Sequence, residues 1–139
     1  MQMSVSKGKL SARCAGLLFM AGLPLFAHHP FSSEFDANKP MTLTGTVTKV
    51  DWAGPHAYIY MNAMNESGKT QEWKLEAASP EYLTMHGMKE TTFKAGEKIT
   101  VNAYRATSEQ NVASARIVTT ANGKKMQVAD PSEDGGPAK

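Results

Sequence analysis

The chain has 139 residues, which is enough for one domain and too few for two ordinary ones. Its only cysteine, Cys14, excludes an intramolecular disulfide, a cysteine-type zinc site and an iron–sulfur cluster. The formal net charge is +2 and no run of Lys or Arg is present, which argues against a nucleic-acid-binding protein.

The first 27 residues have the pattern of a secretory signal peptide. Lys7, Lys9 and Arg13 give a basic start, and an apolar run over 15–26 precedes the small residue Ala27. This run is too short to cross a bilayer of about 30 Å, so we expect cleavage after Ala27 rather than a membrane anchor. The sequence therefore predicts a periplasmic protein without a membrane span in the mature chain. Cleavage removes the only cysteine and three basic residues, which changes the formal charge to −1.

An N-terminal arm and a long strand are expected next. Residues 28–40 (HHPFSSEFDANKP) contain two prolines and no clean periodicity, which indicates an arm. In 41–52, Leu43, Gly45 and Val47 alternate with threonines, a pattern typical of a half-buried strand. The alternation loses its phase near the end of this segment, which predicts a β-bulge or a strong bend.

The remaining elements follow from alternation and turn signals. A short helix is expected over 79–86, because Ser79 can cap it, Pro80 suits its first position and Glu81 lies in its first turn. The segment 129–139 is polar and rich in Gly and Pro, which predicts a disordered tail. Alternating apolar residues predict further strands over 56–64, 70–77, 99–103, 113–120 and 124–128.

This order of elements is that of the OB-fold, a small Greek-key barrel. The sequence therefore predicts a mainly β domain over 41–128. We expect a small OB-like barrel of five to six strands, with one short helix between strands three and four. A bent first strand fits this barrel, because it must pair at both ends. A small open β-sandwich or roll is the main alternative.

No catalytic motif is present. The sequence lacks a P-loop, a GxGxxG, a GxSxG and an HExxH motif, and its acidic residues are scattered. We therefore expect a protein that is not an enzyme.

Three histidines could form a metal site. After cleavage, His28 and His29 would be the first two residues, and a terminal amine with a pKa of about 8 could join their imidazoles in binding a metal. Nitrogen ligands in tetragonal geometry favour copper as Cu(II). His56, which follows a Gly-Pro turn, is the best candidate for a third ligand. The simpler interpretation is that the pair is only polar, that His56 closes the turn, and that His86 is structural.

Trp52, Tyr58 and Tyr60 lie outside the clear apolar stripes. On an OB-like barrel they would belong to the usual ligand face, where aromatic rings could stack on a sugar, a base or a peptide. The favoured alternative is that Phe31 and Phe35 of the arm cover them.

Several short segments carry a resemblance to a known family. They are AHH at 27–29 with Phe31 and Phe35-Asp36, LTGTVTKVDW at 43–52, PHA at 55–57, WKLE at 73–76 with Ser79-Pro80, KAGE at 94–97, and Arg105-Ala106. In this combination the chain resembles the small exported bacterial proteins of domain-of-unknown-function family 6152. The resemblance implies an exported, barrel-like domain and brings no established activity.

The sequence thus predicts an exported, non-enzymatic binding or accessory module whose ligand is not identified. The sharper hypothesis is copper binding through the N-terminal histidine pair. The alternative is an interaction protein that docks a periplasmic partner at a sheet edge or at the aromatic face.

Overall fold

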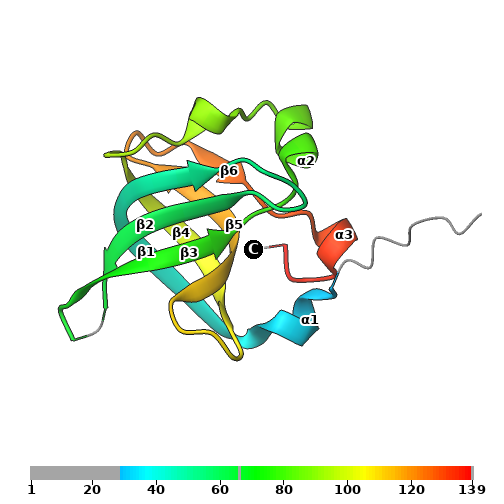
Figure 1. The fold of residues 1–139 in the computed structure, drawn as a ribbon, viewed down its shortest axis with the longest axis horizontal. Coiled ribbons are helices and arrows are strands. Elements are labelled where there is room, and N and C mark those ends of the chain that lie inside the picture. The colour runs from blue at the N-terminus through cyan, green and yellow to red at the C-terminus, as the bar shows by residue number, and fades with distance from the viewer. Residues whose placement is uncertain (1–28, 66, 139) are drawn as a thin grey trace, which may run out of the picture.

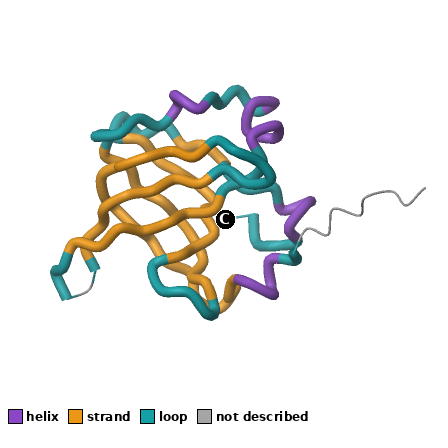
Figure 2. Tube along the Cα trace, viewed as in Figure 1, coloured by secondary structure: helices purple, strands orange, loops and turns teal. Residues whose placement is uncertain are grey.

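The computed structural model describes residues 29–65 and 67–138. Within these ranges, six strands form a ring-like sheet, and short helices lie at its periphery (Figures 1 and 2). The strands are β1 (Phe35–Asp51), β2 (Tyr58–Met64), β3 (Thr70–Glu76), β4 (Lys98–Ala106), β5 (Val112–Thr120) and β6 (Lys125–Gln127). The helices are α1 (Phe31–Glu34), α2 (Pro80–Met85), the 3-10 turn η1 (Glu90–Thr92) and α3 (Pro131–Asp134). No described helix has the length and apolar character needed to cross a membrane.

The sheet closes through one parallel pairing. The strand order is β3-β2-β1-β4-β5-β6, with antiparallel neighbours throughout, and β3 also pairs in parallel with β5. The ring β1–β2–β3–β5–β4 confirms the prediction of a mainly β, small barrel-like fold. The predicted helix is α2, between β3 and β4, and the side chain of Ser79 accepts a hydrogen bond from the Tyr82 amide at its start.

β1 has 17 residues because it pairs with two neighbours. It begins at Phe35, six residues before the predicted start, and pairs with β4 over its first part and with β2 over its second. Gly45 belongs to both ladders, opposite Ala63 and Ile99. A Cβ at Gly45 would lie 2.0 Å from the Asn62 carbonyl oxygen, so this position requires glycine. The predicted bulge is present as a register shift between Val47 and Lys49.

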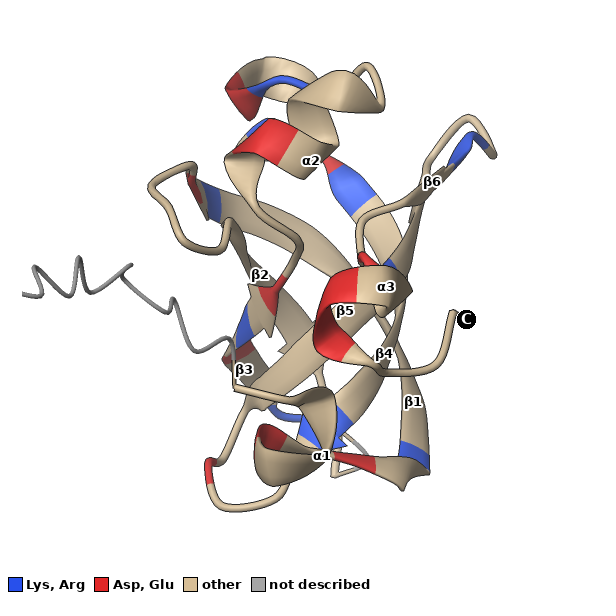
Figure 3. Cartoon of the chain, turned by 90° about the vertical axis from the view of Figure 1, so that its right-hand side faces the viewer, with Lys and Arg blue, Asp and Glu red and all other residues tan. Residues whose placement is uncertain are grey.

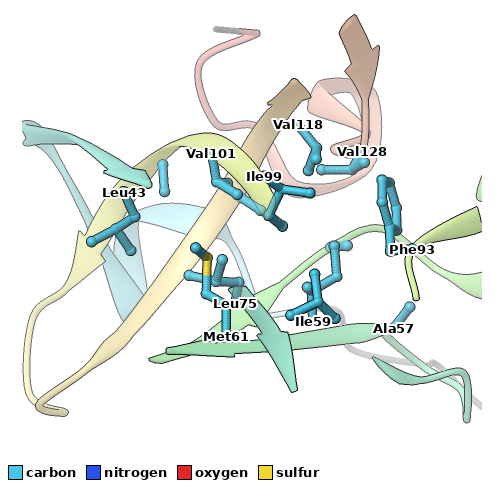
Figure 4. Packing of buried hydrophobic residues seen from close by; sticks show 14 of the residues in the cluster. Leu43, Ala57, Ile59, Met61, Leu75, Phe93, Ile99, Val101, Val118 and Val128 are labelled. Atoms are coloured by element: carbon cyan, nitrogen blue, oxygen red, sulfur yellow. The ribbon is translucent and has the colours of Figure 1, made fainter. Parts of the chain in front are cut away.

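The main core fills the interior of the ring. Trp73 and Leu75 on β3 are buried, as their alternation predicts. Figure 4 shows the packing from Leu43 at one end, past Met61 and Ile59, to Phe93 at the other end. The period-two alternation of the strands therefore builds one continuous apolar interior.

The N-terminal arm is ordered, and its second part belongs to β1. Phe31 and Phe35 pack with their ring centroids 5.5 Å apart, and Phe31 meets Tyr104 edge-on at 5.7 Å. Phe35 pairs with Ala106, so the arm extends β1 along the end of β4. A second small apolar cluster beside the ring thus fixes α1 and the start of β1.

The C-terminal segment also differs from the predicted disordered tail. Val128 and Ala129 are buried, and α3 follows with Asp130 as its N-cap. The Val128 amide donates to the Arg116 carbonyl at 2.9 Å, and its carbonyl accepts from Ala78 at 2.7 Å. These bonds, and an ion pair described below, hold the polar segment against β5. Its Gly- and Pro-rich composition did not reveal these partners.

Candidate functional site

A polar cluster lies where β2 begins and β3 ends. We call His56, Tyr58 and Glu76 the His56 cluster. The Tyr58 hydroxyl donates to Glu76 Oε2 at 3.3 Å, and His56 Nδ1 lies 4.0 Å from Glu76 Oε1. His56 Nδ1 is also 3.3 Å from the Ala77 carbonyl oxygen. Glu76 therefore contacts two other side chains that can hold or exchange a proton, His56 and Tyr58.

The backbone explains why these residues meet. Tyr58 and Glu76 are direct partners in the β2–β3 ladder. The ladder continues beyond the strands, because the Ala57 amide donates to Ala78 at 3.1 Å and the Ala77 amide donates to Ala57 at 2.9 Å. Ala57 points into the core, so the next residue before it, His56, faces the opposite side together with Tyr58.

The cluster has perturbed acid–base properties. Burial, helped by the nearby negative charge of Glu34, raises the pKa of Glu76 above its usual value, although His56, Tyr58 and Lys74 act in the opposite direction. Burial and the Glu76 carboxylate raise the pKa of Tyr58 to about 12. Glu76 is thus a partly desolvated carboxylate, which is common at functional sites.

α3 covers one side of the His56 cluster. Figure 3 shows acidic residues in α1, α2 and α3 on this side of the molecule. Between α3 and the cluster is a cavity of about 10 Å³, which is enough for about one water molecule. Four carboxylates and one guanidinium line it, so the surroundings favour a cation. The polar lining residues are His56, Glu76, Ser114, Arg116, Asp130, Glu133 and Asp134.

Arg116 is the residue at this site that sequence reasoning missed. Its side chain is fully buried on the outer face of β5, with its guanidinium 5.2 Å from the centre of the Phe31 ring. It donates to both carboxylate oxygens of Asp134, to Ser114 Oγ at 3.1 Å and to the Pro137 carbonyl at 2.6 Å. The available signal was an arginine within the apolar segment VASARIV, where a charge needs a buried partner.

The structure describes two of the three predicted metal-ligating histidines. His28 lies outside the described residues, His29 is exposed, and His56 is half-buried. Figures 1 and 3 agree that the described chain begins on the side of the molecule that carries α1 and α3. Among the residues that the structure describes, no group of three or more His, Cys, Asp or Glu side chains could hold a metal. His86 packs on Tyr82, with ring centroids 4.0 Å apart, and contacts the Tyr82 carbonyl.

The three predicted ligand-face aromatics do not form one surface. Trp52 packs against the main core, whereas Tyr58 and Tyr60 project from the other face of β2. The ammonium groups of Lys74 and Lys49 lie over the Tyr58 and Tyr60 rings, 4.2 and 4.5 Å from the centroids.

The expectation that Phe31 and Phe35 cover these aromatics is wrong, because both rings pack on the Tyr104 side of the molecule. Phe35 and Tyr58 only border the same open cavity of about 300 Å³. On the outer face of β2, the Tyr58 and Tyr60 rings carry lysine side chains.

The fold and the cluster define a small barrel-like β module with a polar site at one end of its ring. The sequence matches the family of unknown function DUF6152 over residues 17–115, most of the chain, and the protein belongs to this family. No curated protein and no solved structure matches the chain.

Proposed function

We propose that the protein is an exported, non-enzymatic binding module that holds one Cu(II) ion. In this proposal His56 is the ligand fixed by the fold, and the N-terminal histidines, His28 and His29, complete the site from the processed end of the chain. The proposal is supported chiefly by the position of His56 beside Glu76 and the Ala77 carbonyl.

The surroundings of His56 suit a metal ligand. In the tautomer with a proton on Nδ1, that proton is donated to the Ala77 carbonyl oxygen, and the lone pair lies on Nε2. A ligating histidine commonly donates its second ring nitrogen to a backbone carbonyl or a carboxylate, which orients the ring. His56 has both kinds of group next to Nδ1, because Glu76 is 4.0 Å away.

The charge around the cluster also supports a cation. Glu76 and the acidic residues of α3 line the small cavity beside His56. A bound cation would offset the desolvation of the Glu76 carboxylate, which is the main cause of its raised pKa, and also the repulsion from Glu34. The described chain begins on the side of the molecule that carries α3 (Figures 1 and 3).

Titration of the exported protein with Cu(II) tests the proposal. The N-terminus is first established by sequencing, and the expected first residue is His28. Calorimetry and electron paramagnetic resonance should then give one equivalent of Cu(II) with nitrogen ligands. Affinity should fall as the pH is lowered through the imidazole range, because protons compete for the ligands.

Three variants identify the ligands. One extra residue before His28 should weaken binding if the amine is a ligand, and His56→Ala should weaken it if the fold supplies the third ligand. His86→Ala is the matched control, because His86 packs on Tyr82 and has no part in the proposed site. Unchanged affinity in both the extended protein and His56→Ala would show that the site does not exist.

A further inference from the structure

A second cavity opens at the other end of the ring, away from α2. It has a volume of about 570 Å³, within the usual range for small-molecule sites. The start of β1, the end of β2, the start of β3 and the end of β4 meet there. Pro40, Met41, Leu43, Gln71, Trp73 and Arg105 are among its lining residues.

The inward-facing residues at this end are chemically unlike the rest of the interior. Gln71 follows the inward alternation of Trp73 and Leu75, and Arg105 follows that of Val101 and Ala103. The Arg105 guanidinium lies 5.2 Å from the centre of a Trp73 ring. At this open end of the ring, the inward-facing row on β4 therefore ends in a cation, Arg105, and that on β3 begins with an amide, Gln71.

Trp73, which lines this cavity, has an unsatisfied hydrogen-bond donor. Its side chain is 3% exposed, and Nε1 is buried without an acceptor among the described residues. A buried N–H without an acceptor is unfavourable, and native structures rarely keep one without a reason. The Arg105 guanidinium lies over the Trp73 ring. If this side chain moves to another rotamer, a ligand oxygen that reaches the indole N–H would satisfy the donor.

The charge of the cavity defines the class of ligand. Among the described residues that line it, Arg105 is the only charged one. Within the described residues, Arg105 forms no ion pair with an acidic side chain. One guanidinium matches one carboxylate, which it can bind through two parallel hydrogen bonds. Met41, Leu43 and the Trp73 ring provide an apolar wall for the remainder of the ligand.

We propose that this mouth of the ring binds a small monocarboxylate with an apolar body, held by Arg105 and by the Trp73 indole N–H. The site is independent of the His56 cluster and needs no metal. Benzoate and hexanoate are suitable probes, because each joins one carboxylate to an apolar group.

A titration followed by the indole N–H signals in ¹H–¹⁵N spectra tests the proposal. The chain has two tryptophans, so the spectrum of Trp52→Phe, or that of Trp73→Phe, assigns the Trp73 signal. Benzoate or hexanoate should shift this signal downfield in a saturable way. Benzamide, which keeps the shape of benzoate and lacks its charge, should bind at least about tenfold more weakly, as expected for a charged hydrogen bond.

A matched pair of charge-removing variants completes the experiment. Arg105→Gln should raise the dissociation constant of benzoate about tenfold or more. Lys98→Gln removes an exposed positive charge on the same strand, away from this cavity, and should leave it unchanged. The proposal is overturned if neither probe gives a saturable shift, if benzamide binds as well as benzoate, or if Arg105→Gln has no effect.

Discussion

Arg116 and Asp134 form a two-point ion pair that joins the outer face of β5 to α3. Arg116 Nη1 lies 2.6 Å from Asp134 Oδ2, and Nη2 lies 3.2 Å from Oδ1. The guanidinium is fully buried, whereas about a quarter of the Asp134 side chain is exposed. This pair makes the C-terminal segment part of the folded domain, and it closes one side of the cavity next to His56.

Asp134→Ala should lower the free energy of unfolding by about 3 kcal/mol, because it leaves a buried guanidinium without its carboxylate. Lys39→Ala is the matched control, since it breaks the exposed Lys39–Asp36 pair and should cost at most about 1 kcal/mol. Urea unfolding of both variants measures the difference. Equal losses in the two variants would contradict a structural role for the buried pair.

Gly45→Ala should destabilise the protein by about 1–3 kcal/mol or more, since the new Cβ would overlap the backbone of β2. The Asn62 carbonyl cannot move away without breaking the β1–β2 ladder. Gly54→Ala is the comparison, because a Cβ there meets no heavy atom within 4 Å. Thermal unfolding of the two variants gives the test, and similar melting temperatures would show that β2 shifts without cost.

Glu76→Gln should increase stability at neutral pH and lose this advantage in acid. The pKa of Glu76 is higher in the folded protein than its ordinary value of 4.5, so the folded state holds this proton more tightly than the unfolded state. The stability of the wild type therefore falls as the pH rises from about 4.5 through the pKa that Glu76 has in the folded protein. Below about 4.5 the carboxyl group is protonated in both states, and the advantage of Gln disappears.

Urea unfolding at pH 4 and pH 7 measures this difference between the wild type and Glu76→Gln. Glu72→Gln, on an exposed position of the same strand, controls for the loss of one negative charge. A greater gain for Glu76→Gln at pH 4 than at pH 7 would reverse the predicted sign.

Tyr58 should ionise well above its ordinary value of 10, near pH 12. Its raised pKa means that the folded state keeps the phenol proton, so stability falls as the pH rises from 10 towards 12. In a pH titration followed by tyrosinate absorbance, the wild type should show an ionisation step near pH 12 that is absent from Tyr58→Phe. Glu76→Gln should move this step to lower pH, because the Glu76 charge and hydrogen bond both raise the pKa. Circular dichroism at each pH confirms that the fold persists, and a late step that remains in Tyr58→Phe would assign it to another residue.

Much of the fold was predictable because it depends on local patterns. Alternation in the segments around Val47, Ile59, Leu75 and Val101 predicts strands and identifies their buried faces, and all four residues are buried. The boundaries were less accurate where long-range pairing extends a strand. β1 begins at Phe35 because the end of β4 is available to pair with it, and nothing within 35–40 reveals that partner.

The candidate site was only partly predictable. A histidine after a Gly-Pro turn indicated His56, but its contact with Glu76 depends on the register of β2 against β3. Arg116 and Trp73 Nε1 acquired their importance from burial, which is a property of the closed ring. An arginine in a strand and a tryptophan in a core stripe do not by themselves indicate which polar groups will surround them.

The sequence by itself determined the mainly β class, the buried stripes and the capped helix after Ser79. These features depend on residues that are near neighbours along the chain, so the period of the side chains and the turn chemistry express them directly. The tertiary structure decided the rest. Parallel pairing of β3 with β5 closes the ring and brings α3 to His56 and Arg105 to Trp73. The pairing of β6 with β5 and the Val128–Arg116 hydrogen bond bring Asp134 to Arg116. These pairs are far apart in sequence, and their energies depend on burial, which exists only after the ring has formed.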